Sequence, residues 1–383
     1  MGPVDGHNIP LLLETFRQAD KVQGPVLIHV ITTKGKGYSP AEEDSHKWHG
    51  ASSYKIESGQ MLKTVGPPMY TEVFGETLIE LAKQDPRIIA ITPAMPGGSG
   101  LVKFGKAFPS RMFDVGIAEQ HAATFSAGLA SEGMKPVFAV YSTFMQRAYD
   151  QIVHDICRAN LNVIFAVDRA GFVGADGETH HGVFDIAFMR SLPNIVMMMP
   201  KDENELRHML KTAVDYDQGP IAVRYPRISG TGADLDDELV PIPIGSWEVI
   251  RDGESAAVLA VGQSMLGIAS AAADRLSKEG INLRIINARF IKPMDTDMLL
   301  QLAKEHMSIL TLEEGVKLGG FGSAVLEFYA EEKIYGLEVR NLGIPDEFVE
   351  HGSIKEQLGD AGITIENVIA EIKSLIPRKR QRA

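Results

Sequence analysis

Short apolar runs alternate with amphipathic segments through most of the chain. Phe74, Leu78, Leu81 and Ala82 follow one another at spacings of four, three and one, which places them on one face of a predicted helix. The apolar runs are short and contain many β-branched side chains, as expected for strands buried on both faces of a parallel sheet. Such runs lie at residues 87–92, 135–141, 162–167, 195–200 and 220–225. This alternation predicts a parallel sheet with helices on both faces.

A second α/β pattern follows an acidic, aperiodic segment at residues 230–238. Its strand-like runs and its helical segment lie at residues 256–261, 283–287 and 308–312, and at residues 265–276. A Gly-rich turn at residues 318–322 precedes one more predicted helix. Such a turn can cradle an anion at a helix N-terminus. Because this one lacks the full G-x-G-x-x-G pattern, we interpret it as a turn that serves packing.

The first 50 residues contain few predicted elements. Residues 1–8 are predicted to form a loop in which Asn8 caps a helix, and residues 25–32 are predicted to form a buried parallel strand. One helix and one strand cannot bury a core. We therefore interpret residues 1–50 as the βα remnant of a first domain. Residues 51–68 are aperiodic and end in two prolines, which predicts a linker.

The length of 383 residues exceeds what one core usually supports, so two or three domains are expected. The predicted fold class is α/β, with two doubly wound α/β domains after the βα remnant. We place these domains at residues 69–235 and 243–377.

Composition narrows the possible function classes. A net charge of −12 argues against a nucleic-acid partner. No run reaches the ~18 apolar residues of a membrane span, and no signal-peptide pattern is visible. The single cysteine, Cys157, is expected to be buried and inert in a helix. A chain without an internal disulfide suits the reducing cytoplasm, which is the expected location.

The octet at residues 114–121 links a glycine turn to a predicted helix rich in alanine and glycine. Glu119 lies near the first turn of that helix. A carboxylate there usually does no more than interact with the helix dipole. The whole octet, however, resembles the activating-glutamate motif of thiamine-diphosphate enzymes of the transketolase group. In that group the glutamate holds a proton on the aminopyrimidine of the cofactor, which requires a desolvated and tightly placed carboxylate.

Further motifs extend this resemblance along the whole chain. With these motifs in this order, the chain resembles the family of 1-deoxy-D-xylulose-5-phosphate synthases. The motifs lie at residues 34–38, 48–50, 91–95, 114–121, 141–151, 168–180, 224–227, 288–293 and 343–346. This family joins pyruvate to glyceraldehyde 3-phosphate with loss of carbon dioxide, and its product feeds isoprenoid, thiamine and pyridoxal synthesis. The resemblance therefore implies a thiamine-diphosphate-dependent transferase.

The resemblance implies roles for residues around the cofactor. Glu119 would activate it, and Phe144 would stack on its aminopyrimidine. Lys34 and Tyr38 would lie along the cofactor near its diphosphate. Taken alone, Lys34 would more often belong to a solvated Lys-Gly loop.

The resemblance also implies a substrate site. Arg169 and Arg227 would bind the phosphate of the acceptor, a task that suits the guanidinium fork. Tyr141 and Asp176 would hold hydroxyl groups of the acceptor or of an intermediate. Without the resemblance, Tyr141 is an ordinary aromatic residue at a strand end, and Asp176 is a turn residue before Gly177.

Two histidines are implied in proton transfer during carboligation, because imidazole titrates near neutral pH. They are His49 and His180. Taken alone, His49 would more often be structural, and His180 would lie on a loop surface. His180 and His181 could also form a weak metal pair. No cysteine or third ligand is nearby in the sequence, so we predict no metal site on them.

The sequence departs from the family in one respect. The first domain of the family carries a Gly-Asp-Gly motif, with an asparagine further on, that holds Mg²⁺ on the diphosphate of the cofactor. No Gly-Asp-Gly occurs in this sequence. We therefore expect a truncated synthase or one half of a split one. The Mg²⁺ ligands are expected in the missing domain, which a separate chain could carry. A homodimer through the central domain is expected as well.

Two other interpretations remain open at this point. The chain could be the β-subunit of a 2-oxo-acid dehydrogenase first component, which has the same two-domain plan. That subunit would need neither the segment from Lys34 to His49 nor a phosphate site at Arg169 and Arg227. The chain could also be a catalytically inert relic that only binds a partner. The presence of every residue expected in the two domains argues mildly against decay.

Overall fold

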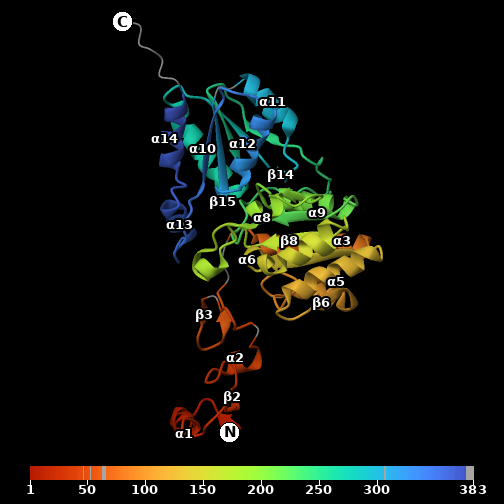
Figure 1. Ribbon diagram of the computed structural model, residues 1–383, viewed down its shortest axis with the longest axis vertical. Coiled ribbons are helices and arrows are strands. Elements are labelled where there is room, and N and C mark those ends of the chain that lie inside the picture. Colours follow the sequence, from red (N-terminus) through yellow and green to blue (C-terminus); the bar gives the residue numbers. More distant parts are fainter. Residues whose placement is uncertain (46, 52, 63–65, 306–307, 377–383) are drawn as a thin grey trace. The chain divides into compact units, whose positions relative to one another are not determined.

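The computed structural model describes residues 1–376, apart from residues 46, 52, 63–65 and 306–307 (Figure 1). The chain divides into two compact units, Met1–Val65 and Gly66–Ala383. Some residues of the predicted linker at 51–68 lie outside the described residues, as does residue 377 at the end of the second predicted domain.

The amino-terminal unit contains helix α1 (Ile9–Ala19), which begins after Asn8. The Asn8 side-chain oxygen accepts a hydrogen bond of 3.0 Å from the backbone N–H of Leu11, so the predicted cap is confirmed. Strands β1 (Val4–Asp5) and β2 (Val30–Ile31) pair in parallel. Residues 1–8 are thus not all loop. The other elements are α2 (Ser39–Glu43), β3 (Tyr54–Lys55) and β4 (Gln60–Met61).

Two features of this unit differ from the prediction. The apolar run at residues 25–32 forms only the two-residue strand β2, both residues of β2 are exposed, and Leu27 is 82% exposed. One helix and one short partner strand are too small to bury the apolar run at residues 25–32. The predicted linker contains an antiparallel hairpin of β3 and β4. The rings of Tyr54 and Trp48 pack edge to face, with centroids 4.5 Å apart, and this contact favours the hairpin.

The second unit begins with a seven-stranded sheet of order β14-β9-β10-β8-β7-β5-β6. Neighbouring strands are parallel, except that β14 is antiparallel to β9. The strands are β5 (Ile88–Thr92), β6 (Met112–Asp114), β7 (Lys135–Tyr141), β8 (Ile164–Asp168), β9 (Val196–Met198), β10 (Ile221–Arg224) and β14 (Phe290–Lys292). All five strands predicted between residues 87 and 225 are confirmed.

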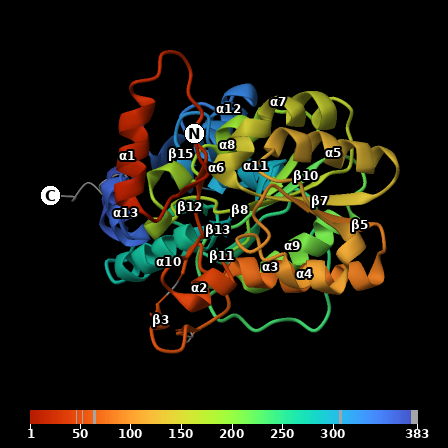
Figure 2. The same ribbon diagram turned by 90° about the horizontal axis from the view of Figure 1, so that it is seen from below.

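Helices cover both faces of this sheet. Figure 2 shows α5 and α7 on one side of it and α3, α4 and α9 on the other. The predicted apolar face of α3, from Phe74 to Ala82, is buried against the core. The helices are α3 (Tyr70–Gln84), α4 (Val102–Ala107), α5 (Glu119–Ser131), α6 (Ser142–Met145), α7 (Tyr149–Gln151), α8 (Asp185–Arg190) and α9 (Glu203–Asp215).

The helix expected to carry Cys157 is interrupted. A 3₁₀ turn at Gln146–Ala148 separates α6 from α7, and a π-helix at Ile152–Cys157 follows. The π-helix is visible in i+5 hydrogen bonds, such as the 3.0 Å bond from the Arg158 N–H to the Val153 carbonyl. Cys157 is buried as predicted, and burial raises the pKa of its thiol to about 11. The thiol is therefore protonated at neutral pH.

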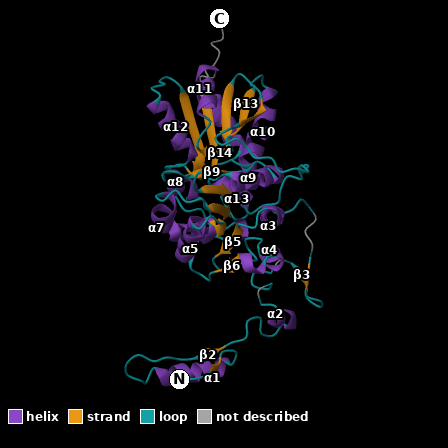
Figure 3. Ribbon diagram, turned by 90° about the vertical axis from the view of Figure 1, so that its right-hand side faces the viewer, coloured by secondary structure: helices purple, strands orange, loops and turns teal. Residues whose placement is uncertain are grey.

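A five-stranded sheet follows, with order β11-β13-β12-β15-β16 (Figure 3). All its neighbours are parallel except β11 and β13. The strands are β11 (Glu248–Arg251), β12 (Ala256–Ala260), β13 (Leu283–Asn287), β15 (Ser308–Val316) and β16 (Glu338–Ile344). The helices are α10 (Gln263–Ser277), α11 (Thr296–Glu305), α12 (Phe321–Glu331), α13 (Ile354–Asp360) and α14 (Ile365–Leu375). The predicted α/β fold class is confirmed.

One strand crosses from the second α/β region into the sheet of the first. Strand β14 follows β13 in the chain, yet it pairs with β9, with Phe290 opposite Met198. The Lys292 ammonium group donates hydrogen bonds to the carbonyls of Arg190 and Leu192 at the end of α8. The two α/β regions therefore share a sheet edge as well as an apolar core.

The Gly-rich turn before α12 does hold an anion, and that anion belongs to the chain. The Glu313 carboxylate accepts hydrogen bonds from the N–H groups of Phe321 (2.7 Å) and Gly322 (2.8 Å). A Cβ at Gly320 would lie 2.5 Å from a Glu313 carboxylate oxygen, so the turn requires glycine there. The predicted packing turn is therefore also an internal anion site. Strand β15 continues through Glu313 and Glu314, beyond residue 312, where the predicted strand ended.

Both carboxyl groups are buried, and burial raises the pKa of Glu313 and of Glu314 to about 7. In the fold they keep protons that the unfolded chain releases near its ordinary pKa of 4.5. The free energy of unfolding should therefore fall as pH rises from about 4.5 to about 7, by roughly 3 kcal/mol for each group. Glu314→Gln should stabilise the protein at pH 8 and change little at pH 5. Denaturant unfolding at both pH values tests this, and equal effects at the two pH values would contradict it.

Candidate functional site

The turn before α5 places Glu119 as the first residue of that helix. The Asp114 carboxylate at the end of β6 accepts hydrogen bonds from the N–H groups of Ala94 (2.8 Å) and Gly116 (3.0 Å). Gly116 has a φ of +71°, which lets the chain reverse before the helix. Glu119 is only 4% exposed. The predicted desolvated, tightly placed carboxylate is therefore present.

Arg147 connects Glu119 with Phe144. Its Nη1 donates a hydrogen bond of 3.0 Å to Glu119 Oε1, and its guanidinium carbon lies 5.3 Å from the centroid of the Phe144 ring. One planar N–H-bearing cation thus touches both the buried carboxylate and the aromatic ring. A flat heterocycle with N–H groups, such as an aminopyrimidine, fits the same pair of contacts. We did not predict Arg147, although it stands three residues after Phe144 in a motif that we had noted.

Aromatic contacts continue from Phe144 toward the substrate residues predicted from the sequence. The rings of Tyr141 and Phe144 stack with centroids 5.6 Å apart, and His180 meets Phe144 edge to face at 5.3 Å. The hydroxyl group of Thr179 lies 3.0 Å from His180 Nδ1. Burial raises the pKa of Tyr141, so its hydroxyl group remains a proton donor at neutral pH. Tyr141, Phe144 and His180 therefore form one continuous surface.

Arg169 and Arg227 meet at Asp176. Arg227 Nε lies 2.9 Å from Asp176 Oδ2, and Arg169 Nε lies 3.8 Å from the same oxygen. The Arg169 guanidinium also covers the Tyr141 ring at 4.0 Å. Arg169 Nε is buried and has no hydrogen-bond partner in the described part of the chain. Two cations and a free N–H donor therefore converge beside the aromatic surface.

Asp168, which we did not predict, fixes Arg169. It is fully buried at the end of β8, and its Oδ1 accepts from the backbone N–H of Arg169 at 2.7 Å. Thr71 donates to Asp168 Oδ2 at 2.9 Å. Arg169 has a φ of +60°, an unusual backbone conformation that these bonds help to hold. The signal in the sequence was an acid directly before the predicted arginine, at the carboxyl end of a strand.

Gly98 forms a backbone contact with the Arg169 guanidinium. Arg169 Nη1 donates a 2.6 Å hydrogen bond to the Gly98 carbonyl. A Cβ at Gly98 would lie 1.8 Å from the Tyr141 hydroxyl oxygen, so only glycine fits. The loop after β5 thus contributes backbone to the site, as expected for the carboxyl end of a parallel strand.

The three other predicted residues belong to the amino-terminal unit. There, Lys34 Nζ lies 2.8 Å from His49 Nδ1. The Tyr38 hydroxyl donates a 2.8 Å hydrogen bond to the Ile56 carbonyl, and its ring packs edge to face on Trp48. The unit therefore brings Lys34 and His49 together and holds Tyr38 in an aromatic cluster.

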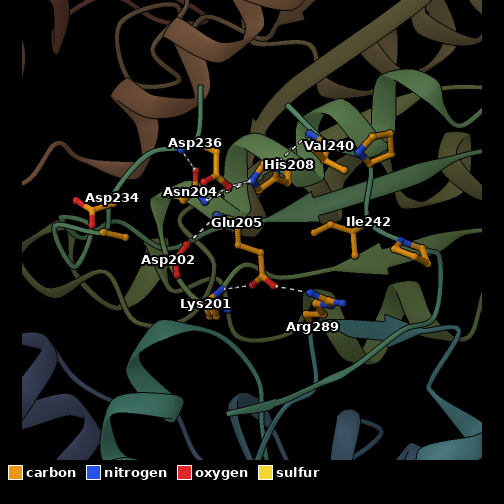
Figure 4. Close-up of a pocket in the computed structure, with 13 residues that line it drawn as sticks. Lys201, Asp202, Asn204, Glu205, His208, Asp234, Asp236, Val240, Ile242 and Arg289 are labelled. Carbon is orange, nitrogen blue, oxygen red and sulfur yellow. Dashed lines mark hydrogen bonds and ion pairs between the residues drawn. The ribbon is translucent and has the colours of Figure 1, made fainter. Parts of the chain in front are cut away.

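A cavity of about 380 Å³ lies elsewhere, beside α9 and the segment at residues 233–243 (Figure 4). Several of its polar groups are paired with one another. Glu205 accepts from the backbone N–H of Lys201 (2.6 Å) and from Arg289 (3.2 Å), and His208 Nε2 lies 2.8 Å from Asp236. We interpret this cavity as part of the contact between α9 and the segment that connects the two α/β regions.

Two further properties concern the residues that the structure describes. No group of three or more His, Cys, Asp or Glu side chains among them could hold a metal ion. Within the same residues, no helix combines the length and the apolar character that crossing a bilayer requires.

Comparison with known proteins connects this geometry to one family. The family model for the transketolase pyrimidine-binding domain matches residues 67–231, and that for the transketolase C-terminal domain matches residues 245–368. A third model, for 1-deoxy-D-xylulose-5-phosphate synthase, matches residues 1–32.

Relatives named 1-deoxy-D-xylulose-5-phosphate synthase match almost the whole chain. The protein from Brevibacillus brevis is 57% identical over 98% of this chain, and that from Shouchella clausii is 58% identical over 100% of it. The chain spans 60% and 61% of the lengths of these relatives.

A solved structure agrees with these relatives. It is described as a split gene transketolase, inactive beta4 tetramer, and superposes with a TM-score of 0.72 at 32% identity. The match covers 82% of this chain and 100% of the other. The chain therefore belongs to the transketolase family.

Proposed function

We propose that this chain supplies the aminopyrimidine-binding and acceptor-binding parts of a 1-deoxy-D-xylulose-5-phosphate synthase. The reaction is the condensation of pyruvate with glyceraldehyde 3-phosphate with loss of carbon dioxide, and its product feeds isoprenoid, thiamine and pyridoxal synthesis. Identity of 57–58% with proteins of that name supports the proposal. So does the meeting of Glu119, Phe144 and the two arginines in one unit. The cytoplasm is the proposed location.

In this proposal Glu119 and Phe144 hold the aminopyrimidine ring of thiamine diphosphate. The bound cofactor supplies a nucleophilic carbon that can hold the negative charge left after decarboxylation. Glu119 keeps a proton on the ring, which a buried carboxylate can do without competition from water. Lys34 and Tyr38 would contact the diphosphate, and Mg²⁺ would be held by the Gly-Asp-Gly motif, which this sequence does not contain.

Side chains of this protein would transfer protons to the substrates and orient the acceptor. His180 lies edge to face with Phe144 and delivers a proton near the reacting carbon, with His49 as a second donor. Tyr141 and Asp176 hold hydroxyl groups of the acceptor. Both protein side chains adjoin the guanidinium of Arg169, so the acceptor would be oriented from its phosphate end.

The observation that carries the proposal is the pair of guanidiniums on Asp176. A phosphate dianion could bind beside the carboxylate there, because Arg169 and Arg227 together offer several N–H donors and two positive charges. A β-subunit of a 2-oxo-acid dehydrogenase has no phosphorylated acceptor to bind at this place. An inert relic would have no need to keep this geometry.

We also propose partners for the chain. A separate chain with a Gly-Asp-Gly motif would complete the cofactor site. A homodimer would form through the central domain, with contact surface from the small side chains of α5 and from the segment Tyr149 to Ile156. The similar solved structure comes from a split gene transketolase and is described as inactive, which supports division of this activity between chains.

Replacement of the arginines tests the phosphate site. Arg169→Ala or Arg227→Ala should raise KM for glyceraldehyde 3-phosphate about 10- to 150-fold, since each loses a charge-assisted contact worth about 1.5–3 kcal/mol. KM for pyruvate should change little, because pyruvate has no phosphate. Arg275→Ala is the matched control. Arg275 is half exposed and forms an ion pair with Glu366, far along the chain from the phosphate site. Steady-state kinetics in the complete assembly give the answer, and an equal rise in both KM values would remove the phosphate site.

A further inference from the structure

The loop from Arg169 to Gly182 carries Arg169, Asp176 and His180. Side chains of the carboxyl-terminal α/β region form hydrogen bonds with its backbone. Gln357 on α13 is fully buried and faces the backbone of Gly174. The Gly174 N–H donates to Gln357 Oε1 at 3.1 Å, and Gln357 Nε2 donates to the carbonyls of Glu350 (3.3 Å) and Gly174 (3.5 Å). A single side-chain amide therefore satisfies both backbone groups of one loop residue.

A second side chain from the same region holds the loop two residues earlier. Glu314 on β15 accepts a 2.8 Å hydrogen bond from the Phe172 N–H. A Cβ at Gly171 would lie 2.5 Å from the Glu314 carboxyl carbon, so the loop passes directly against this side chain. Buried backbone groups without partners are costly. The two side chains therefore make the conformation of the loop depend on the carboxyl-terminal region.

The held segment leads directly to the phosphate site. Asp176 follows Gly174 by two residues and lies 2.9 Å from Arg227 Nε. The Val173 carbonyl accepts a long hydrogen bond of 3.5 Å from Arg227 Nη1. Gln357 therefore fixes the backbone next to the Val173 carbonyl and the Asp176 carboxylate, which both accept from Arg227. Its own hydrogen bonds go to backbone groups and not to either arginine.

We propose that Gln357 is a positioning residue through which the carboxyl-terminal region sets the distance between Arg227 and Arg169. Its amide fixes Gly174, Gly174 fixes Asp176, and Asp176 aligns the two guanidiniums for a three-carbon phosphate monoester. This inference rests on the proposed function, because it gives a purpose to a domain that contributes no predicted catalytic residue.

The first test measures the loop without any ligand. Gln357→Met keeps the length of the side chain and removes its amide, and Gln357→Ala guards against a misfit of methionine. Gln301→Met on α11 is the control, because Gln301 is exposed and bonds only Glu305 in the contacts recorded for its side chain. Both Gln357 variants should raise amide hydrogen exchange at residues 172–178 about 5- to 30-fold, the effect of two lost hydrogen bonds. Unchanged exchange there would overturn the inference.

The second test measures the phosphate site with glycerol 3-phosphate, an unreactive three-carbon phosphate ester, by calorimetry on the full chain. The Gln357 variants should bind it about 5- to 30-fold more weakly at unchanged thermal midpoint, and Gln301→Met should bind as the parent does. Faster loop exchange with unchanged affinity would overturn the link to the arginines. No binding by the parent chain, with Arg227→Ala indistinguishable from it, would overturn the phosphate site itself and the inference with it.

In an assembly that turns over, the same variants should raise KM for glyceraldehyde 3-phosphate and leave KM for pyruvate unchanged. A purely structural role for Gln357 would lower kcat without raising KM for glyceraldehyde 3-phosphate more than KM for pyruvate. That result would overturn the positioning role.

Discussion

A polypeptide of these 383 residues is expected to bind thiamine diphosphate about 10³- to 10⁶-fold more weakly than a complete synthase does. The diphosphate carries most of the charge of the cofactor, and the Gly-Asp-Gly motif that holds it through Mg²⁺ is absent from the sequence. If three charge-assisted contacts are missing, each worth about 1.5–3 kcal/mol, the deficit is about 4.5–9 kcal/mol. An intact Glu119 cannot offset a loss of this size.

Calorimetry with thiamine diphosphate and Mg²⁺ measures this deficit on the chain alone and on its mixture with a separately expressed Gly-Asp-Gly domain. We expect millimolar or weaker binding by the chain alone and turnover only in the mixture. Micromolar binding and turnover by the chain alone would contradict the prediction. The absence of binding in both cases would favour an inert relic.

Glu119→Gln should lower turnover of the complete assembly at least about 10²- to 10⁴-fold, as expected for the loss of an acid–base group. The amide cannot take or hold the proton of the aminopyrimidine ring. Folding should be nearly unchanged, since glutamine has the same shape and its amide oxygen can still accept the hydrogen bond from Arg147.

Glu132→Gln is the matched control, because Glu132 is exposed at the other end of α5. Thermal unfolding of both variants separates loss of structure from loss of chemistry. Turnover by Glu119→Gln within about twofold of the parent would show that Glu119 has a different role.

The sequence predicted those parts of the fold that depend on local periodicity. The buried face of α3 and the strands β5, β7, β8, β9 and β10 follow from spacing and from short apolar runs. Strand β6 was not predicted, because its segment is polar. Strand β15 was predicted too short, because Glu313 and Glu314 are charged residue types that normally end a buried strand. They continue it because Phe321, Gly322 and Phe172 supply N–H donors from elsewhere in the chain. Periodicity contains no information about such partners.

The candidate site was only partly predictable for the same reason. Tyr141, Phe144, His180, Arg169, Asp176 and Arg227 do meet in the structure, and Glu119 joins them through Arg147. Their roles remain proposals. Arg147, Asp168 and Gln357 were not predicted, because each acts on a residue that is distant in sequence or hidden in backbone geometry. No pattern of residue types announces a glutamine that binds the backbone of a glycine 183 positions away.

Strand β14 decides which fragments of this chain can be expressed. A cut at the segment near residue 240, where the two family models separate, would remove β14 from β9. The fragment that ends there would present the backbone of β9 as an open edge next to buried apolar residues. Open edges of this kind pair with other chains, so the fragment should form insoluble aggregates. A fragment that ended just after β14 would in turn remove β15 from β12 and open a second edge, so an expressed chain should include the whole five-stranded sheet.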